Sequence, residues 1–355
     1  MLVGGFSFRP GGGLPDGLMW VPAVQVAWDG SDGLVLTLNL LVRPAGGWTK
    51  LADRRVDHAL RLLNAPARTG SAGAPPTSPT IQHARPTREQ WRRLVGEALR
   101  EIDAGTFSKV VLARQVLLRS DGGFSAASAL GALLGRQPGG AVFGVGLLHQ
   151  WFLGSSPECL VRKKGDEVFS HGLAGSAPRG VDALQDKALA DFLLSDPKNR
   201  REHAVVAEFV ERELRRVCTG VEVGTDEPVL KLADVQHLQT KVRGTLHNGH
   251  RVDLLTLVDR LHPTPAVAGF PRGPALAWLD RHEPFDRSWY AGTVGWTAAD
   301  GSGEMTVAIR STLLTQHTAT VYAGCGLVSG SDEKAEYHES SLKMRPMLTA
   351  LGDVP

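Results

Sequence analysis

The order of its helix-like and strand-like apolar patterns is the feature of this chain that most restricts its fold. The two kinds of pattern are mixed along the sequence and do not alternate as regular βαβ units. Because a parallel sheet needs that alternation, we predict an α+β fold with largely antiparallel sheets. Strands are predicted at Leu34–Val42, Lys109–Leu118, Ala141–Gly146, Trp151–Gly154, Glu304–Leu314 and Thr318–Ala323, and helices at Val181–Ser195, Arg200–Cys218 and from about Ser331.

The composition is that of a globular protein. Apolar residues make up 42% of the 355 residues and charged residues 21%, and the net charge is +2. This balance gives no reason to expect nucleic acid or an anionic membrane as a partner. Three cysteines without CxxC spacing argue against a disulfide framework and against a zinc site. Because no apolar run reaches about 18 residues and MLVGGFSFRP lacks a signal-peptide pattern, we expect a cytoplasmic protein.

The sequence suggests one internal boundary. Residues 64–86 are rich in Ala, Pro, Ser, Thr and Gly without an apolar period, which is typical of a mobile surface linker. We therefore separate residues 1–86, with N-terminal strands and this linker, from residues 87–355, the main part of the same fold. A helix begins after the linker, since Thr87 and Gln90 have capping-box spacing and Gly105 is placed to end it.

Glu202 lies at an unfavourable place in its predicted helix. It precedes Val205 and Val206 by three and four residues, so it falls at the edge of the buried face. A carboxylate at that edge is costly unless a cation such as a metal ion compensates it. An acidic residue that favours the helix dipole in the first turn is the simpler explanation, and the local sequence alone favours it.

The last predicted helix carries a second acidic pattern. Ser331 is a suitable N-cap, and Glu336, Glu339 and Lys343 recur on one face. A solvated, salt-bridged helix surface explains this spacing as well as a cation site does. Mg²⁺ prefers carboxylate oxygens and usually takes only one or two from the protein, so Glu202 with Glu339 would suit it. Spacing within each helix does not show that the two helices face each other.

Ten sequence blocks occur in one order across residues 107–351. They are FSKVVLAR (107–114), GSSPECLVRK (154–163), GLAGSAPRG (172–180), REHAVV (201–206), VQHLQTKVRGTL (235–246), LHPTPAVAGFP (261–271), WYAGTVGW (289–296), VAIRS (307–311), YAGCGLVSGSD (322–332) and EYHESSLK (336–343). In this order they resemble the chorismate-utilising enzymes, which include isochorismate, salicylate, anthranilate and aminodeoxychorismate synthases. Residues 1–60 resemble the family only loosely.

The resemblance implies a fold and a metal site. The expected fold is a single large α+β domain, in which two layered halves with mostly antiparallel sheets and outer helices surround a deep cleft. By the same resemblance, Glu202 and Glu339 coordinate Mg²⁺, and Glu336 reaches the metal through water. The metal would bind the ring carboxylate of chorismate, which supplies the contact between the two helices that periodicity does not show.

Three positions bear on the nucleophile of the reaction. Water-using members carry a general-base lysine where this chain has Lys109, and burial on an apolar strand disfavours the charged form of a lysine. Glu158 would be the general acid that protonates the leaving 4-hydroxyl, which requires a partly apolar pocket. Ala174 stands where aminodeoxychorismate synthases carry a nucleophilic lysine. Without the block match, a strand-end lysine extended to solvent is the preferred interpretation of Lys109. The local sequence also allows Glu158 to be an exposed turn glutamate after Pro157.

The remaining site positions follow from the same resemblance. Ala266 favours release of isochorismate, because salicylate synthases tend to have threonine there. The resemblance assigns substrate contacts to Arg310 at the enolpyruvyl carboxylate, Tyr290 beside it, His237 near the ring, Lys343 at the metal-bound carboxylate, and backbone groups of Gly175, Ser176 and Gly324. The ordinary alternative for Arg310 is a sheet-edge arginine paired with an acidic residue. For Tyr290 and His237 it is packing in the core.

We therefore expect Mg²⁺-dependent isomerisation of chorismate to isochorismate, with water attacking C2 and the C4 hydroxyl leaving, to supply menaquinone, siderophore or other secondary-metabolite biosynthesis. A monomer without a glutamine amidotransferase subunit is expected. The alternatives are a salicylate synthase, which also eliminates pyruvate, and a non-catalytic relative that only binds chorismate. Two departures from the family pattern are PRG at 271–273, where many relatives have a lysine after the proline, and Pro346, which should kink or end the last helix.

Overall fold

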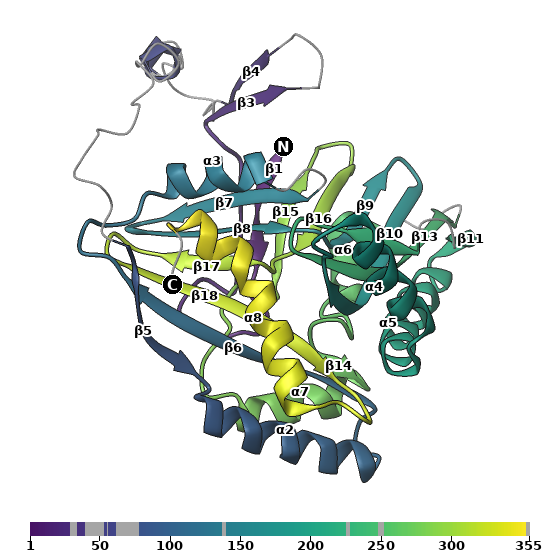
Figure 1. The fold of residues 1–355 in the computed structure, drawn as a ribbon. Coiled ribbons are helices and arrows are strands. Elements are labelled where there is room, and N and C mark those ends of the chain that lie inside the picture. The colour runs from purple at the N-terminus through teal and green to yellow at the C-terminus, as the bar shows by residue number, and fades with distance from the viewer. Residues whose placement is uncertain are drawn as a thin grey trace.

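Two large sheets, both built from antiparallel strand pairs, form the body of the molecule (Figure 1). The computed structural model describes residues 1–28, 34–39, 53–54, 56–61, 78–136, 140–224, 228–247 and 252–352. A separate hairpin of β3 (Val24–Trp28) and β4 (Leu34–Leu38) extends beyond the two sheets. The prediction of largely antiparallel sheets is confirmed.

The first sheet joins the N-terminal strands to the middle of the chain. Its path runs in the order β11-β13-β10-β9-β16-β15-β1-β2, and β12 pairs with β13 at the side. The strands are β1 (Leu2–Phe6), β2 (Gly17–Trp20), β9 (Cys159–Lys164), β10 (Glu167–Pro178), β11 (Cys218–Gly224), β12 (Val229–Lys231), β13 (Val235–Leu246), β15 (Thr293–Thr297) and β16 (Gly303–Val307).

The second sheet is centred on the long apolar strand that begins at Lys109. Its path runs in the order β14-β6-β18-β17-β8-β7, and β5 pairs with β6. The predicted pair of strands around residues 141–154 is confirmed as a hairpin. The strands are β5 (Thr80–Arg85), β6 (Lys109–Arg119), β7 (Ala141–Leu147), β8 (Gln150–Ser156), β14 (Gly269–Phe270), β17 (Ser311–Leu314) and β18 (Thr318–Leu327).

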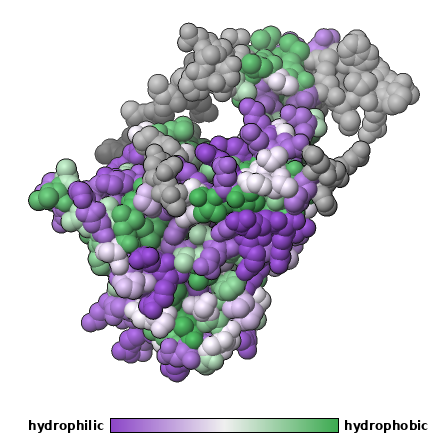
Figure 2. All heavy atoms as spheres, turned by 90° about the vertical axis from the view of Figure 1, so that its right-hand side faces the viewer, coloured by the Kyte–Doolittle hydropathy of each residue, from purple (hydrophilic) through white to green (hydrophobic). Residues whose placement is uncertain are grey.

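Helices lie on the outside of the sheets, and Figure 2 shows a largely hydrophilic surface with scattered apolar areas on the side of α5 and β11. One hydrophobic core includes Val110 of the second sheet and Val161 of the first, so the two sheets belong to a single domain. None of the described helices is long and apolar enough to cross a membrane. The helices are α2 (Arg88–Asp103), α3 (Ala126–Arg136), α4 (Ala183–Ser195), α5 (Pro197–Arg215), α6 (Leu254–Leu261), α7 (Arg272–His282) and α8 (Glu333–Ala350).

The capping box at the start of α2 is confirmed. The backbone N–H of Gln90 donates to the Thr87 hydroxyl at 3.2 Å, and the backbone N–H of Thr87 donates to the Gln90 side chain at 2.9 Å. Gly105 follows the helix with φ +77°, a left-handed conformation that favours glycine. Local hydrogen bonding therefore sets both ends of this helix.

The prediction of a mobile linker over residues 64–86 is wrong at its C-terminal end. Thr80–Arg85 form β5, which pairs with β6, while residues 64–77 lie outside the described part of the chain. No apolar period marks this strand because its side chains are mostly exposed, and its backbone pairing with β6 holds it. Of the strand predicted at Leu34–Val42, β4 covers Leu34–Leu38, and residues 40–42 lie outside the described residues.

The single strand predicted at Glu304–Leu314 is two strands in different sheets. β16 ends at Val307 in the first sheet, and β17 begins at Ser311 in the second. Between them Arg310 has φ +54°, a left-handed conformation that a strand does not contain. The apolar pattern continues through this break because both strands enter the core, so the sequence did not reveal the crossover.

Three predicted helix boundaries also need correction. The helix predicted at Arg200–Cys218 runs over Pro197–Arg215, because Asp196 caps it and Pro197 occupies its first turn. The last helix is capped by Asp332 rather than Ser331, whose hydroxyl accepts from the backbone N–H of Val328 instead. This helix does not end at Pro346 but continues through it to Ala350.

Candidate active site

A cavity with about 610 Å³ of space, part of it open to solvent, lies where the two sheets meet, beside α5 and α8. Its walls come from β6, β10, β13 and β18 and from the crossover segment that contains Arg310. Its lining of apolar side chains with a few charged and polar groups is typical of a small-molecule site. The predicted residues that line it are Glu158, Gly175, Ser176, Glu202, His237, Ala266, Tyr290, Arg310, Gly324 and Lys343.

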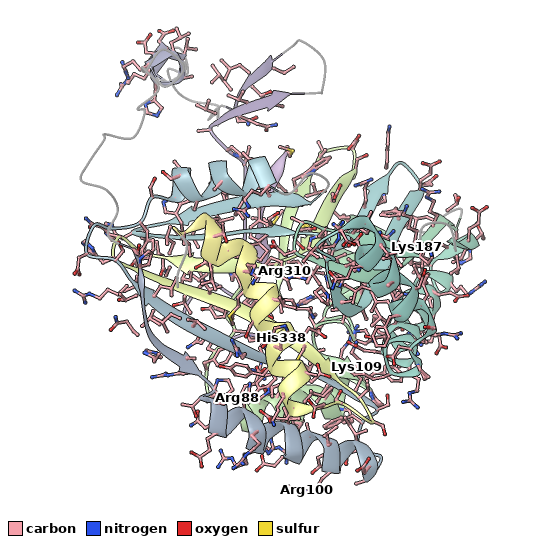
Figure 3. All side chains as sticks on the ribbon, viewed as in Figure 1. Arg88, Arg100, Lys109, Lys187, Arg310 and His338 are labelled. Carbon is pink, nitrogen blue, oxygen red and sulfur yellow. The ribbon has the colours of Figure 1, made fainter. Side chains whose placement is uncertain are left out.

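The three other predicted site residues lie next to this cavity. Lys109 is fully buried behind Glu202, with its Nζ 3.1 Å from Oε1 of that carboxylate. Glu336 and Glu339 line a neighbouring groove that shares Ser176 with the cavity. In Figure 3, Lys109 and Arg310 lie beside α8 near the centre of the molecule, whereas Arg100 lies at the outer edge of α2. The residues predicted on separate helices and strands are therefore brought together.

Glycines in β10 set the position of the wall between the cavity and α5. The pairing of β10 with β13 shifts between Ala174 and Ser176, and the intervening Gly175 has φ +72°. A Cβ at Gly172 would lie 3.1 Å from the Val206 side chain, and one at Gly175 would lie 3.2 Å from Asn199. The absence of side chains here allows α5 to approach β10 closely, which places Glu202 at the cavity.

Gly326 makes room for the buried pair of Lys109 and Glu202. A Cβ on Gly326 would lie 2.2 Å from Oε1 of Glu202 and 2.8 Å from Cε of Lys109. The Nζ of Lys109 approaches Glu202 as an ion pair but without hydrogen-bond geometry to any described side chain or backbone group. Two strands and one helix that are distant in sequence, β6, β18 and α5, therefore meet in this one contact.

The N-terminal half of α8 is anchored to α2 and β6. The guanidinium groups of Arg88 and Arg114 lie 4.0 and 3.8 Å from the centre of the Tyr337 ring, and the Trp91 indole N–H donates to the backbone oxygen of Glu333 at 3.1 Å. These contacts hold the helix that carries Glu336, Glu339 and Lys343. The face predicted from their spacing is therefore turned inward and is not a solvated surface.

Each of the three carboxylates predicted as metal ligands faces a lysine. Glu202 pairs with Lys109, Glu336 with Lys198 at 2.5 Å, and Glu339 with Lys343 at 2.6 Å. Within the described ranges, no three His, Cys, Asp or Glu side chains converge as a ready metal-ligand group. One carboxylate oxygen, Oε2 of Glu336, is nevertheless buried without a hydrogen-bond partner.

The charges of this cluster perturb its two carboxylates on α8 in opposite directions. Burial, together with the negative charge of Glu339, raises the pKa of Glu336 to about 7, against the opposing effect of Lys198. Burial acts in the same direction on Glu339, but Lys343 and its hydrogen bond outweigh it, so the pKa of Glu339 lies below its ordinary value. Glu339 is therefore the carboxylate that stays ionised.

Arg310 and His237 form a buried pair on the wall of the cavity. The Nη2 of Arg310 donates to Nε2 of His237 at 2.8 Å, so Nδ1 carries the imidazole proton and lies 3.2 Å from the backbone oxygen of Gly175. Burial and the charge of Arg310 hold the pKa of His237 well below its ordinary value. Among the described residues, no carboxylate forms an ion pair with Arg310, which leaves its charge available to an anionic ligand.

Glu158 is a buried carboxyl group on the wall of the cavity. Two donors hold its backbone oxygen: the backbone N–H of Val307 at 2.9 Å and the hydroxyl of Thr306 at 2.7 Å. Burial raises the pKa of its side chain to about 7, although Lys109, Lys343 and Arg310 act in the opposite direction. The alternative of an exposed turn residue is thus excluded, and a carboxyl group that can carry a proton near neutral pH faces the cavity.

Tyr290 and Gly324 form a close contact on the cavity wall. A Cβ on Gly324 would lie 3.0 Å from the Tyr290 hydroxyl, and the Tyr290 ring stacks on Tyr322 with 5.1 Å between centres. Burial raises the pKa of Tyr290, so its hydroxyl stays protonated and can donate. Ala266 lies in the same cavity, as predicted from the HPTPA block.

The sequence analysis did not identify Gly326, Lys198 or Cys325 as site residues. Lys198 stands four residues before Glu202 on α5, so helical spacing placed it on the same face and was a usable signal. Nothing in the local sequence marks Gly326, because its role depends on two side chains from other elements. Cys325 lines the cavity with a buried thiol whose pKa burial raises well above its ordinary value.

Comparison with known proteins identifies the family. The family model described as "Chorismate binding enzyme" matches residues 1–352. The "Salicylate biosynthesis isochorismate synthase" of Pseudomonas aeruginosa is 36% identical over 361 residues, covering 99% of this chain and 74% of the relative. Isochorismate synthase MenF of Bacillus subtilis is 34% identical, with the same coverage. The structure of Escherichia coli MenF, a menaquinone-specific isochorismate synthase, matches with a TM-score of 0.85 at 29% identity, covering 99% of this chain and 78% of that one. This chain belongs to the chorismate-binding enzyme family, as its ordered sequence blocks predicted.

Proposed function

We propose that this protein is an isochorismate synthase, which converts chorismate to isochorismate with the help of Mg²⁺. The names of its relatives support the reaction, since several curated relatives are isochorismate synthases. The observation that carries the chemistry is the position of Glu158: its carboxyl group, with a pKa of about 7, lines a cavity that Lys109 adjoins through Glu202. A proton donor and a potential proton acceptor therefore serve one small pocket.

In the proposed reaction Glu158 is the general acid. It donates its proton to the C4 hydroxyl as that group leaves as water, while the two ring double bonds shift. Burial keeps this carboxyl group protonated up to about pH 7, which an exposed glutamate would not achieve. Its backbone is held by β16, so the side chain has a defined position in the cavity.

Lys109 is the proposed general base. It takes a proton from the water that attacks C2 of the ring, and it can do so only as the neutral amine, with its Nζ turned from Glu202 toward that water. The side chain is fully buried on β6 and makes no hydrogen bond to a described group, so it has no other assigned partner. Ala174, in a block where aminating relatives carry a lysine, supports water as the nucleophile.

Two cations suit the two carboxylates of chorismate. Arg310 would bind the enolpyruvyl carboxylate with its planar fork, with the Tyr290 hydroxyl beside it. Lys343, whose Nζ lies 3.3 Å from the backbone oxygen of Gly324, would contact the ring carboxylate. The neutral His237 would keep Arg310 in place through the hydrogen bond that its Nε2 accepts.

The residues around Glu202 and α8 suit a divalent cation. Glu202 and Glu339 would hold Mg²⁺ directly, and Glu336 would reach it through water, because hard cations prefer carboxylate oxygens. The buried and unpartnered Oε2 of Glu336 supports this assignment. When bound, the ion would neutralise the ring carboxylate and withdraw charge from the diene.

The test is product analysis by NMR after incubation of the pure protein with chorismate and Mg²⁺. We expect isochorismate in near balance with chorismate, since the two are isomers. Lys109→Ala and Glu158→Gln should each abolish turnover while circular dichroism remains that of the folded protein. Near-normal activity in both variants would refute the assigned roles, and no isochorismate from the unmodified protein would refute the proposed reaction.

Two other activities are distinguished by the same incubation. A salicylate synthase would release pyruvate, which coupling to lactate dehydrogenase detects; Ala266 in the cavity argues against that outcome. A non-catalytic relative would bind chorismate without converting it, but pure binding would not need both Lys109 and Glu158. A cytoplasmic monomer that supplies menaquinone or siderophore synthesis stays a prediction.

A further inference from the structure

The pairing of Lys198 with Glu336 suggests a role that the proposed reaction does not use. Lys198 lies in the first turn of α5, four residues before Glu202, and Glu336 lies three residues before Glu339 on α8. The two helices therefore present a lysine and a carboxylate to each other directly beside the proposed metal ligands. The Lys198 Nζ lies 2.5 Å from Oε1 of Glu336, and the Glu336 side chain is 1% exposed.

Burial explains why the ionised form of this carboxylate needs a cation beside it. An ionised carboxylate removed from water is strongly destabilising unless an opposite charge compensates it. In the described structure, Lys198 supplies that charge at one oxygen, and the other oxygen, Oε2, has no hydrogen-bond partner. A half-paired carboxylate of this kind is already placed to accept a second cation.

Lys198 also has somewhere to move. Its side chain is 25% exposed and lines the groove beside the cavity. This groove has about 790 Å³ of space, part of it open to solvent. Lys109 differs in this respect because it is fully buried, so it cannot leave Glu202 for solvent. Of the lysines paired with these carboxylates, Lys198 is the most exposed; Lys343 is 17% exposed.

We propose that Lys198 is a built-in counter-ion, which supplies a positive charge at Glu336 in the absence of metal and turns into the outer groove when a divalent cation binds beside that carboxylate. This inference rests on the proposed metal site. Because two positive charges a few ångströms apart repel, Lys198 lowers the affinity for the cation and stabilises the protein without it. It is a positioning residue for the metal ligands and takes no part in the chemical step.

The test measures cation binding directly, in the absence of chorismate. Mn²⁺ is titrated into the full chain and free Mn²⁺ is followed by electron paramagnetic resonance. Lys198→Met should bind Mn²⁺ at least about tenfold more tightly than the unmodified protein, a difference of about 1.4 kcal/mol. Lys198→Arg should stay close to the unmodified protein, because it keeps the charge. Lys187→Met is the matched control, since Lys187 is exposed on α4 and pairs with Asp191 (Figure 3).

A second readout is the melting temperature without metal. Lys198→Met should melt below the unmodified protein in chelator and should gain more on addition of Mn²⁺. Should Lys198→Met not fold, Lys198→Gln is held to the same two criteria. Equal or weaker Mn²⁺ binding by the neutral variant would overturn the counter-ion role. If the unmodified protein does not bind Mn²⁺, or if Glu339→Gln leaves its Mn²⁺ affinity unchanged, the metal site itself is refuted, and the counter-ion role with it.

Discussion

Replacement of Gly326 by alanine should disable the site without unfolding the protein. The new methyl group would lie 2.2 Å from Oε1 of Glu202 and 2.8 Å from Cε of Lys109. Because non-bonded atoms need about 3.5 Å, Glu202 must retreat by about 1 Å or more. Misplacement of a reacting group by about 1 Å costs on the order of 100-fold in rate, or about 2.7 kcal/mol of transition-state stabilisation.

The loss should appear in activity more than in stability. The atoms that must move are the ends of two flexible side chains and not backbone, so we expect overpacking to cost at most about 3 kcal/mol of unfolding free energy. The assay is the initial rate of isochorismate formation, with thermal unfolding followed by circular dichroism. Gly96→Ala in α2 is the control, because its Cβ would meet no heavy atom within 4 Å. It should keep full activity and gain up to about 1 kcal/mol of stability. A Gly326→Ala protein that folds and retains activity within about threefold, where about 100-fold is expected, would refute the reasoning.

Four further predictions follow from particular residues. Because burial places the folded-state pKa of Glu158 at about 7, above its ordinary value of 4.5, its acid form is lost as pH rises through 7, and kcat/KM should fall over the same range in a pH profile. The same raised pKa means that stability is lost as pH rises from 4.5 to 7. Above pH 7, the free energy of unfolding of Glu158→Gln, measured by urea denaturation, should therefore exceed that of the unmodified protein by on the order of 3 kcal/mol. Arg287→Met should cost about 3–5 kcal/mol in urea unfolding, because it leaves the buried Glu283 without its partner at 2.5 Å; a loss below about 1 kcal/mol would contradict this. Ala266→Thr should raise pyruvate release in a lactate dehydrogenase assay if this position controls elimination, and an unchanged background would count against that role.

Local signals in the sequence predicted the elements that depend on local forces. The Thr87–Gln90 capping box and the Gly105 stop set the ends of α2, and both are hydrogen-bond or dihedral preferences of neighbouring residues. The strand at 109–118 and the hairpin at 141–154 were found because apolar residues cluster where a strand is buried. These elements confirm the predicted α+β class.

Long-range pairing explains the predictions that failed. β5 was assigned to a linker because exposed residues give no apolar pattern, and only its pairing with β6 reveals a strand. The break at Arg310 was missed because apolar residues on both sides enter the core, although they belong to different sheets. In each case the deciding partner is thirty or more residues away or in another sheet.

By itself, the sequence determined the fold class, the family and the identity of most residues at the cavity. The ordered blocks carry that information, and Glu158, Glu202 and Lys343 were all named from them. The tertiary structure alone decided that Glu202 faces Lys109, that Lys198 faces Glu336, and that Glu158 has a pKa near 7. The physical reason is that burial and charge at each group come from strands and helices distant in sequence, and no local pattern contains those distances.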